Sequence, residues 1–139
     1  MCGDYFNLKA AKTEEPTPVP VTAYHVHIYF DAASEKTALE TARKIDELFP
    51  GAVEDAHRVG KVGPHTLNNI GVTITPESFG EIVSWLQMNR KDLSILVHPR
   101  TGDEWRDHMD CALWLGKPVD LNMKFLNHFK PGTPKAPTP

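Results

Sequence analysis

Apolar residues recur at every second position in several stretches of this chain and with helical spacing in two others. The alternation predicts strands over residues 24–30, 67–75 and 93–98, and a weaker strand over 52–62. Helical spacing predicts helices over 34–49 and from Thr75 onward, where a Thr-Pro-Glu start precedes the apolar stripe. The order strand-helix-strand-strand-helix-strand predicts an α+β, ferredoxin-like antiparallel sheet with strand order 4-1-3-2 and both helices on one face.

The residues after the fourth predicted strand indicate two further elements. Thr101 and Glu104 have the spacing of a capping box, which predicts a third helix that ends at Gly116. Alternating apolar residues over 119–125 predict an additional C-terminal strand. We expect one domain over residues 23–129, between a flexible N-terminal tail (1–22) and a proline-rich C-terminal tail (130–139). Such tails carry too few large apolar groups to offset the entropy of ordering them.

Composition narrows the class of protein. Hydrophobic and charged contents of 40% and 24% are ordinary for a globular domain. The net charge is −3 and there is no basic run, so we expect neither a nucleic-acid nor a membrane partner. Two cysteines without a CxxC motif, and no apparent secretory signal, favour a reducing cytoplasmic setting.

Histidine is the residue that points to chemistry. In the first predicted strand, His25, His27 and Tyr29 lie opposite the apolar residues that face the helices. We take the first and third strands as parallel and the fourth as antiparallel to the first. That arrangement brings His25 and His27 to one end of the sheet, together with His65 and His98. His57 lies near them, and His108 lies on the third helix. Gathered histidines suit a mononuclear metal site and proton transfer near neutral pH.

Each of these residues also has a structural interpretation. A single histidine often lies at a surface or hydrogen-bonds to backbone. Asp103 and Asp107 fit helix N-terminal charges, and Asp31 fits a turn that ends a strand. Arg100 is either solvated or binds a substrate carboxylate. The convergence of several histidines, and no single one, favours a site.

The motifs that surround these histidines resemble those of the DOPA 4,5-dioxygenase family. They are the segment 24–31 with its His-x-His, Val62-Gly63-Pro64-His65, the segment 94–103 with His98-Pro99-Arg100-Thr101-Gly102, Asp107-His108, and residues 112–116. The resemblance covers about Tyr24 to Leu126. It implies a small ferredoxin-like domain, often a homodimer, that opens a catechol ring in extradiol fashion with O₂ and non-haem Fe(II).

This resemblance leads to an assignment of roles. We expect His27, His65 and His98 to bind Fe(II), which zinc or another divalent metal could replace in a purified sample. His108 is the first choice for acid/base work and His57 the second, while His25 is either an alternative ligand or a substrate contact. Arg100 and Tyr29 are expected to bind the substrate, a small aromatic such as DOPA. Both an all-histidine ligand set and one completed by a carboxylate stay open.

A second class of function fits the same residues. A non-catalytic ferredoxin-like module could hold a structural or adventitious metal, such as zinc, with a closed ligand set. An open site beside an apolar, aromatic pocket favours the dioxygenase instead.

Overall fold

The structure is a computed structural model that describes residues 19–55 and 57–130. Most of the two expected tails therefore lies outside the described residues. The described chain is an α+β fold whose helices and strands follow in the order β1 (Ala23–Tyr29), α1 (Glu35–Leu48), β2 (Arg58–Gly60), β3 (Asn69–Ile74), a 3₁₀ turn (Pro76–Ser78), α2 (Phe79–Asn89), β4 (Ile95–Arg100), α3 (Glu104–His108), β5 (Leu113–Leu115) and α4 (Met123–Asn127).

The strands form one antiparallel sheet in the order β2-β3-β1-β4-β5. The predicted order of the first four strands is confirmed, with β5 added beside β4. One expectation was wrong: β1 and β3 run antiparallel, with Tyr29 opposite Asn69. The reason is that β1 returns through α1 to a β2 that runs parallel to it, and the connection from β2 to β3 then reverses the chain. The weak strand expected over 52–62 is reduced to β2 and an isolated bridge between Val53 and Ile74.

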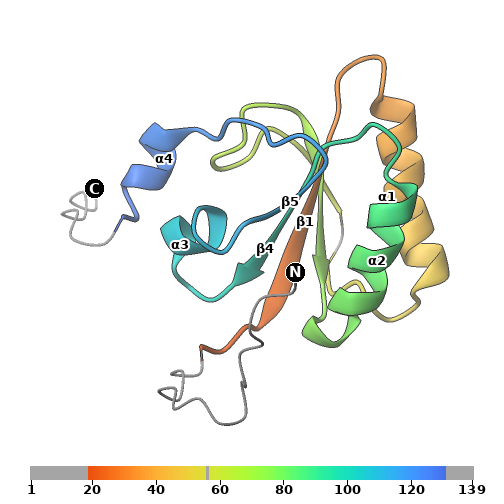
Figure 1. The fold of residues 1–139 in the computed structure, drawn as a ribbon, viewed down its shortest axis with the longest axis horizontal. Helices are drawn as coiled ribbons and strands as arrows, with labels where there is room; N and C mark the ends of the chain where they lie inside the picture. The colour runs from red at the N-terminus through yellow and green to blue at the C-terminus, as the bar shows by residue number, and fades with distance from the viewer. Residues whose placement is uncertain (1–18, 56, 131–139) are drawn as a thin grey trace, which may run out of the picture.

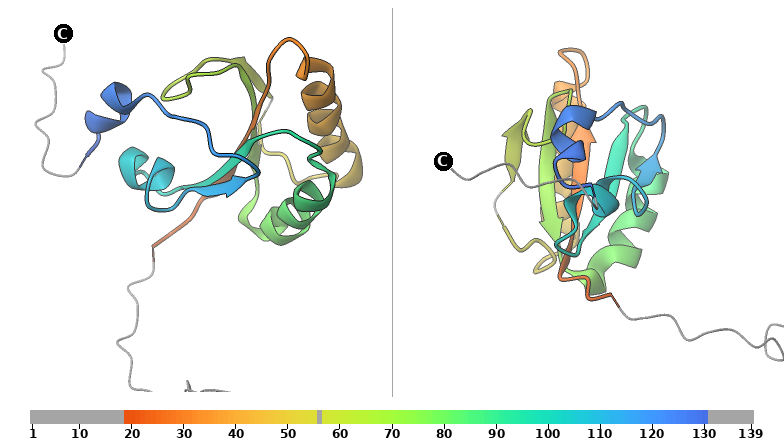
Figure 2. Two further views of the ribbon diagram at one scale, coloured as in Figure 1. Left: turned by 45° about the horizontal axis from the view of Figure 1, so that its top comes forward. Right: turned by 90° about the vertical axis from the view of Figure 1, so that its left-hand side faces the viewer.

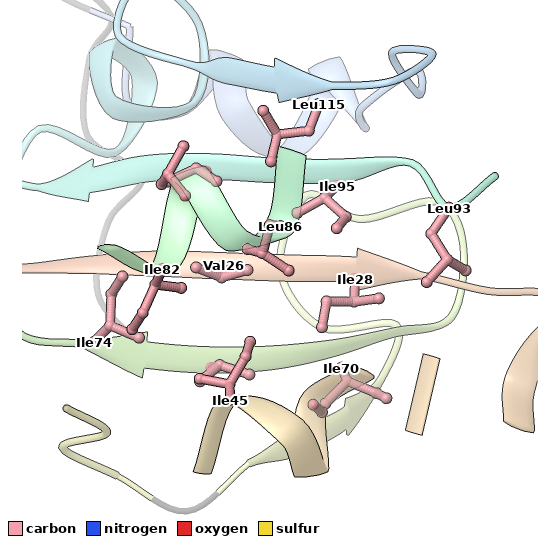
Figure 3. Close-up of a cluster of buried hydrophobic side chains, with 14 of the residues drawn as sticks. Val26, Ile28, Ile45, Ile70, Ile74, Ile82, Leu86, Leu93, Ile95 and Leu115 are labelled. Carbon is pink, nitrogen blue, oxygen red and sulfur yellow. The ribbon is translucent and has the colours of Figure 1, made fainter. Parts of the chain in front are cut away.

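Helices α1 and α2 cover one face of the sheet (Figure 1). The core between them contains fully buried aliphatic side chains from β1, β3, β4 and both helices, which Figure 3 shows meeting in one layer. Val26 and Ile28 of β1 lie at its centre, with Ile70 and Ile95 paired to Ile28 on the neighbouring strands. Alternation along β1 therefore directs its histidines to the other face.

That other face is covered by the same chain. Helices α3 and α4 lie on the side of the sheet opposite α1 and α2 (Figures 1 and 2). The segment before β3 joins them there, since Asn122 N–H donates to the Pro64 carbonyl over 2.6 Å. No second subunit is therefore needed to cover this face of the sheet.

The C-terminal elements differ from those expected. Asp103, and not Thr101, caps α3, because its carboxylate accepts from the Arg106 N–H while the Thr101 hydroxyl donates to Asp107. The helix ends at His108 and not at Gly116, which instead follows β5 with φ +76°. The strand expected over 119–125 is an extended segment followed by α4, since the Asn122 side chain accepts from Phe125 N–H and starts a helix.

Replacing Asp103 by alanine should destabilise the fold modestly. The substitution removes the side-chain acceptor of the Arg106 N–H at the start of α3. We expect the free energy of unfolding to fall by about 1 kcal/mol, within the range of about 0.5–2 kcal/mol for lost N-caps. Urea unfolding of the variant beside Asp110→Ala, an exposed change after the same helix, measures it. Equal stability of the two variants would contradict the capping role.

No helix among the described residues is long and apolar enough to cross a membrane.

Candidate metal centre

Five histidines meet on the sheet face opposite α1 and α2. His25 and His27 come from β1, His98 from β4, His108 from α3 and His65 from the segment before β3. His25 lies directly opposite His98 in the sheet. Ring centroids are 4.0 Å apart for His27 and His65, and 3.9 Å apart for His98 and His108. Two overlapping groups, His25-His27-His98 and His27-His65-His108, each have ligand atoms within 4.8 Å of one another. We call these five residues the histidine cluster.

His65 reaches the cluster by a route other than the one expected. Because β1 and β3 are antiparallel, the segment before β3 begins at the far end of β1, where Tyr29 pairs with Asn69. It then folds back over the sheet face. Contacts with the chain before α4 hold it there: His65 forms a bridge with Leu121, and the Thr66 hydroxyl donates to the Asp120 carbonyl over 2.6 Å.

The other candidate residues are placed differently. His57 lies outside the cluster, with Nε2 2.6 Å from the Asp46 carboxylate of α1. Tyr29 is only 3% exposed and lies behind His65, so it does not line the cavity beside the cluster. Arg100 does line that cavity, and it also donates to the Thr22 hydroxyl and lies 3.6 Å from Glu54.

Hydrogen bonds at Nδ1 fix three of the rings. His27 Nδ1 is 3.0 Å from Asn69 Oδ1, His98 Nδ1 is 2.9 Å from the Pro99 carbonyl, and His108 Nδ1 is 2.8 Å from the Glu104 carbonyl. The Asn69 amide nitrogen donates to two backbone carbonyls, so its oxygen faces His27. Carbonyl oxygens only accept, and therefore each of these Nδ1 atoms carries a proton. In a neutral ring with that proton, Nε2 keeps a lone pair. No sequence motif identified Asn69 as a partner of the histidines. Its role follows only from the pairing of β3 with β1, which places it opposite Tyr29.

The lone pairs of two rings point at one another. His27 Nε2 and His98 Nε2 are 3.1 Å apart. With both protons on Nδ1, no hydrogen bond joins these atoms, and an electropositive group between them relieves the repulsion. Histidine binds first-row metals at about 2.0–2.1 Å, so two Nε2 atoms at this separation can share one ion. Bonds from Nδ1 to carbonyl oxygens are also the usual outer support of metal-binding histidines. The donor set fits a divalent transition metal.

Burial favours the neutral form of four rings of the cluster: His25, His27, His65 and His98. It lowers the pKa of His27 and His98 well below 6.5, with neighbouring histidines adding to the effect. The pKa of His65 falls to about 4, first through burial and then through His108. Burial, and then the Arg100 charge, lower the pKa of His25 as well. Neutral imidazole is the form that binds a metal, so no proton has to leave these four rings at neutral pH.

The stability of the metal-free protein should fall in acid. In the unfolded chain the histidines bind protons near pH 6.5, whereas in the folded chain His65 does so only near pH 4. Between these values the unfolded state binds more protons, so the free energy of unfolding decreases as pH falls from about 6.5 to about 4 and is unaffected by these groups above that window. Urea unfolding of chelator-treated protein across this range checks the sign. A stability that rises toward acid would contradict the buried, neutral cluster.

A cavity of about 290 Å³ opens beside the cluster. His25, His27, His65 and His108 line it on one side and Val62 and Phe125 supply apolar surface. Charged groups complete the lining: Asp55, Arg58, Arg100 and Glu104. The volume is close to the lower end for small-molecule sites, about 300 Å³.

Carboxylates play a smaller part than histidines. The buried Asp107 accepts from the Thr101 N–H and hydroxyl, which holds the turn between β4 and α3. The side chain of Asp103 caps α3. Glu104 approaches the cluster from the same helix as His108, with Oε2 3.7 Å from His108 Nδ1 and the side chain half exposed.

Comparisons with known proteins find relatives over most of this chain. The model of the Dopa 4,5-dioxygenase family matches residues 24–125. A DOPA 4,5-dioxygenase from Amanita muscaria is 34% identical over 111 residues, 74% of this chain and 49% of that protein. An "Uncharacterized 21.2 kDa protein" from Botryotinia fuckeliana is 36% identical over 119 residues, 78% of this chain and 65% of that protein. The aligned part of the chain thus spans 49% and 65% of the length of these two curated relatives.

A solved structure shares the fold. The crystal structure of a protein from Nostoc punctiforme, described as a "putative dioxygenase", is 38% identical, with a TM-score of 0.64 over 78% of this chain and 93% of the other. The fold and the cluster define an α+β domain with a histidine-rich site able to hold a metal ion. The chain belongs to the Dopa 4,5-dioxygenase family.

Proposed function

We propose that this protein is a ring-cleaving dioxygenase that opens a catechol with O₂ and a non-haem Fe(II) ion. One observation carries the proposal: buried, neutral histidines whose Nε2 lone pairs converge beside an open cavity. Membership of the family and the name of the Amanita relative agree with it. A closed structural zinc site fits less well, because the cluster borders a cavity large enough for a small aromatic.

The residues around the cavity suit a catecholic acid. When bound, Fe(II) would bring the catechol oxygens and O₂ together, with His27 and His98 at the centre of its ligand set. Phe125 and Val62 offer apolar surface for the ring. Arg100 and Arg58 line the same cavity and can receive an acidic substituent of the substrate. DOPA or a related catecholic acid is the substrate we propose, with extradiol cleavage.

Anaerobic loading with Fe(II) followed by a screen of catechols tests this function. We expect O₂ uptake with a yellow ring-opened product from at least one catecholic acid, and a higher KM for the same acid in Arg100→Gln. His57→Ala serves as the control, because His57 lies outside the cluster. Stoichiometric metal without O₂ uptake on any catechol would favour the non-catalytic binding module instead.

Three further expectations, on the domain, the oligomeric state and the cellular location, belong to the proposal. The order of elements and the strand order support interpreting residues 23–129 as a ferredoxin-like domain with additional C-terminal elements. A homodimer is proposed on the family resemblance alone, and sedimentation should give about twice the 15.5 kDa chain mass. A cytoplasmic location is proposed from the absence of a structural disulfide framework in the sequence.

A further inference from the structure

One member of the histidine cluster has a different kind of partner. His27, His98 and His108 each place Nδ1 against a carbonyl oxygen. His65 instead places Nδ1 2.7 Å from the Tyr29 hydroxyl. A hydroxyl can donate as well as accept, so this bond alone does not show which ring nitrogen of His65 carries the proton. The surroundings of Tyr29 determine it.

Those surroundings make Tyr29 the donor. Its side chain is buried in the sheet face, 5.9 Å from the Trp114 ring in a stacked arrangement. Within the described chain, His65 Nδ1 is the hydrogen-bond partner found for the hydroxyl. If Nδ1–H donated to the phenol oxygen, the buried phenol proton would have no acceptor there, which costs about 1–3 kcal/mol. A distance of 2.7 Å also suits an O–H donor better than an N–H donor.

We propose that His65 presents Nε2–H to the cavity as a hydrogen-bond donor, and that a bound metal takes its histidines from the other rings of the cluster. Among these, His25, His27 and His98 have ligand atoms within 4.8 Å of one another. The proposal rests on the proposed function for the identity of the metal and substrate. With Nδ1 accepting from Tyr29, neutral His65 carries its proton on Nε2 and has no lone pair for a metal. The three carbonyl-bonded rings have the opposite tautomer. Tyr29 is then a positioning residue, and not the substrate contact expected from the sequence.

This division of roles gives the cavity a neutral donor. His65 lines the cavity beside His27 and His108. Its Nε2–H can therefore hydrogen-bond to an anionic oxygen of a bound substrate without adding a full charge to the site. A donor aimed at a developing oxyanion is typically worth about 10²–10³-fold in kcat. The bridge to Leu121 and the 2.7 Å bond to Tyr29 fix the ring that supplies it.

Long-range ¹⁵N–¹H correlation spectra of the metal-free protein test the tautomers directly. Near neutral pH, where burial holds the pKa of His65 low, we expect the Nε2–H pattern for His65. We expect the Nδ1–H pattern for the three carbonyl-bonded rings, those of His27, His98 and His108. Tyr29→Phe should shift His65 away from pure Nε2–H. Tyr24→Phe is the matched control, because Tyr24 packs against Phe79 on the helix-covered side. An Nδ1–H pattern for His65 in the unaltered protein would overturn the proposal.

Metal content of variants gives a second, independent readout. His65→Gln and Tyr29→Phe should keep stoichiometric iron after anaerobic loading, whereas His98→Gln should lose it. If the family activity is present, His65→Ala should lower kcat by about 10²–10³-fold with iron still bound. Loss of iron in both His65→Gln and His65→Ala, with His98→Gln retaining it, would reverse the assignment. Neither the spectra nor the metal counts depend on finding the substrate, so failure of the proposed function is distinguishable from failure of this assignment.

Discussion

Replacing His98 by alanine abolishes metal binding and turnover together, and this is the largest functional effect we expect. His98 is buried in β4, its Nδ1–H is bonded to the Pro99 carbonyl, and its Nε2 lies 3.1 Å from His27 Nε2. Loss of an outer hydrogen-bond partner of a metal ligand typically costs about 10–100-fold in metal affinity, and loss of the ligand itself should cost more. Iron per chain after anaerobic loading, measured beside O₂ uptake, gives both quantities.

Two controls keep the result interpretable. His57→Ala removes an imidazole that bonds to Asp46 of α1 and should leave iron and turnover unchanged. His98→Asn replaces the buried ring by a smaller polar group, and a melting curve of the metal-free variant shows whether the fold survives. A folded His98→Asn protein that binds iron as tightly as the unaltered protein would remove His98 from the ligand set.

Replacing Ile28 by alanine should produce the largest loss of stability. Ile28 is fully buried at the centre of β1, and its sheet partners Ile70 and Ile95 are fully buried beside it (Figure 3). Truncating a buried isoleucine removes apolar contacts and leaves a cavity that the sheet and both helices cannot fill, at a cost of about 2–5 kcal/mol. Urea unfolding with linear extrapolation measures the loss.

Met88→Ala is the matched control for this prediction. Met88 lies on α2 with 84% of its surface exposed, so its truncation should change the free energy of unfolding by no more than about 0.5 kcal/mol. An Ile28→Ala variant as stable as Met88→Ala would show that the layer between the sheet and the helices is not the stabilising core.

Local patterns were sufficient for β1, β3 and β4 and for the two long helices. Alternation in 24–30 separates the core-facing Val26 and Ile28 from His25 and His27, because neighbouring side chains of a strand must point to opposite faces. Helical spacing likewise predicted α1 and α2 within a few residues. The short C-terminal elements were predicted wrongly, because a five-residue helix such as α4 has too few turns to produce a helical period of apolar residues.

The membership of the site was predictable in part. The strand residues His25, His27 and His98 were expected at one end of the sheet and are found together, because pairing of two strands brings facing residues within a few ångströms. His57 was expected nearby and is instead bonded to α1. His57 precedes the short edge strand β2, and the pairing of a strand does not fix the position of a residue outside it. The sequence pattern therefore could not place the His57 ring.

The sequence by itself determined which chemistry this protein has available and which strand residues carry it: the count of histidines, their spacing in His25-Val26-His27 and the alternation that turns them from the core. Only the tertiary structure decided how His65 arrives, since antiparallel β1 and β3 start its segment at the far end of the sheet and contacts with Leu121 and Asp120 return it. The tertiary structure also selected the partners of each Nδ1. Carbonyl oxygens face three rings and a buried hydroxyl faces the fourth. Because a hydrogen-bond partner sets the tautomer of an imidazole, the roles of chemically identical side chains are decided by neighbours that are distant in the sequence.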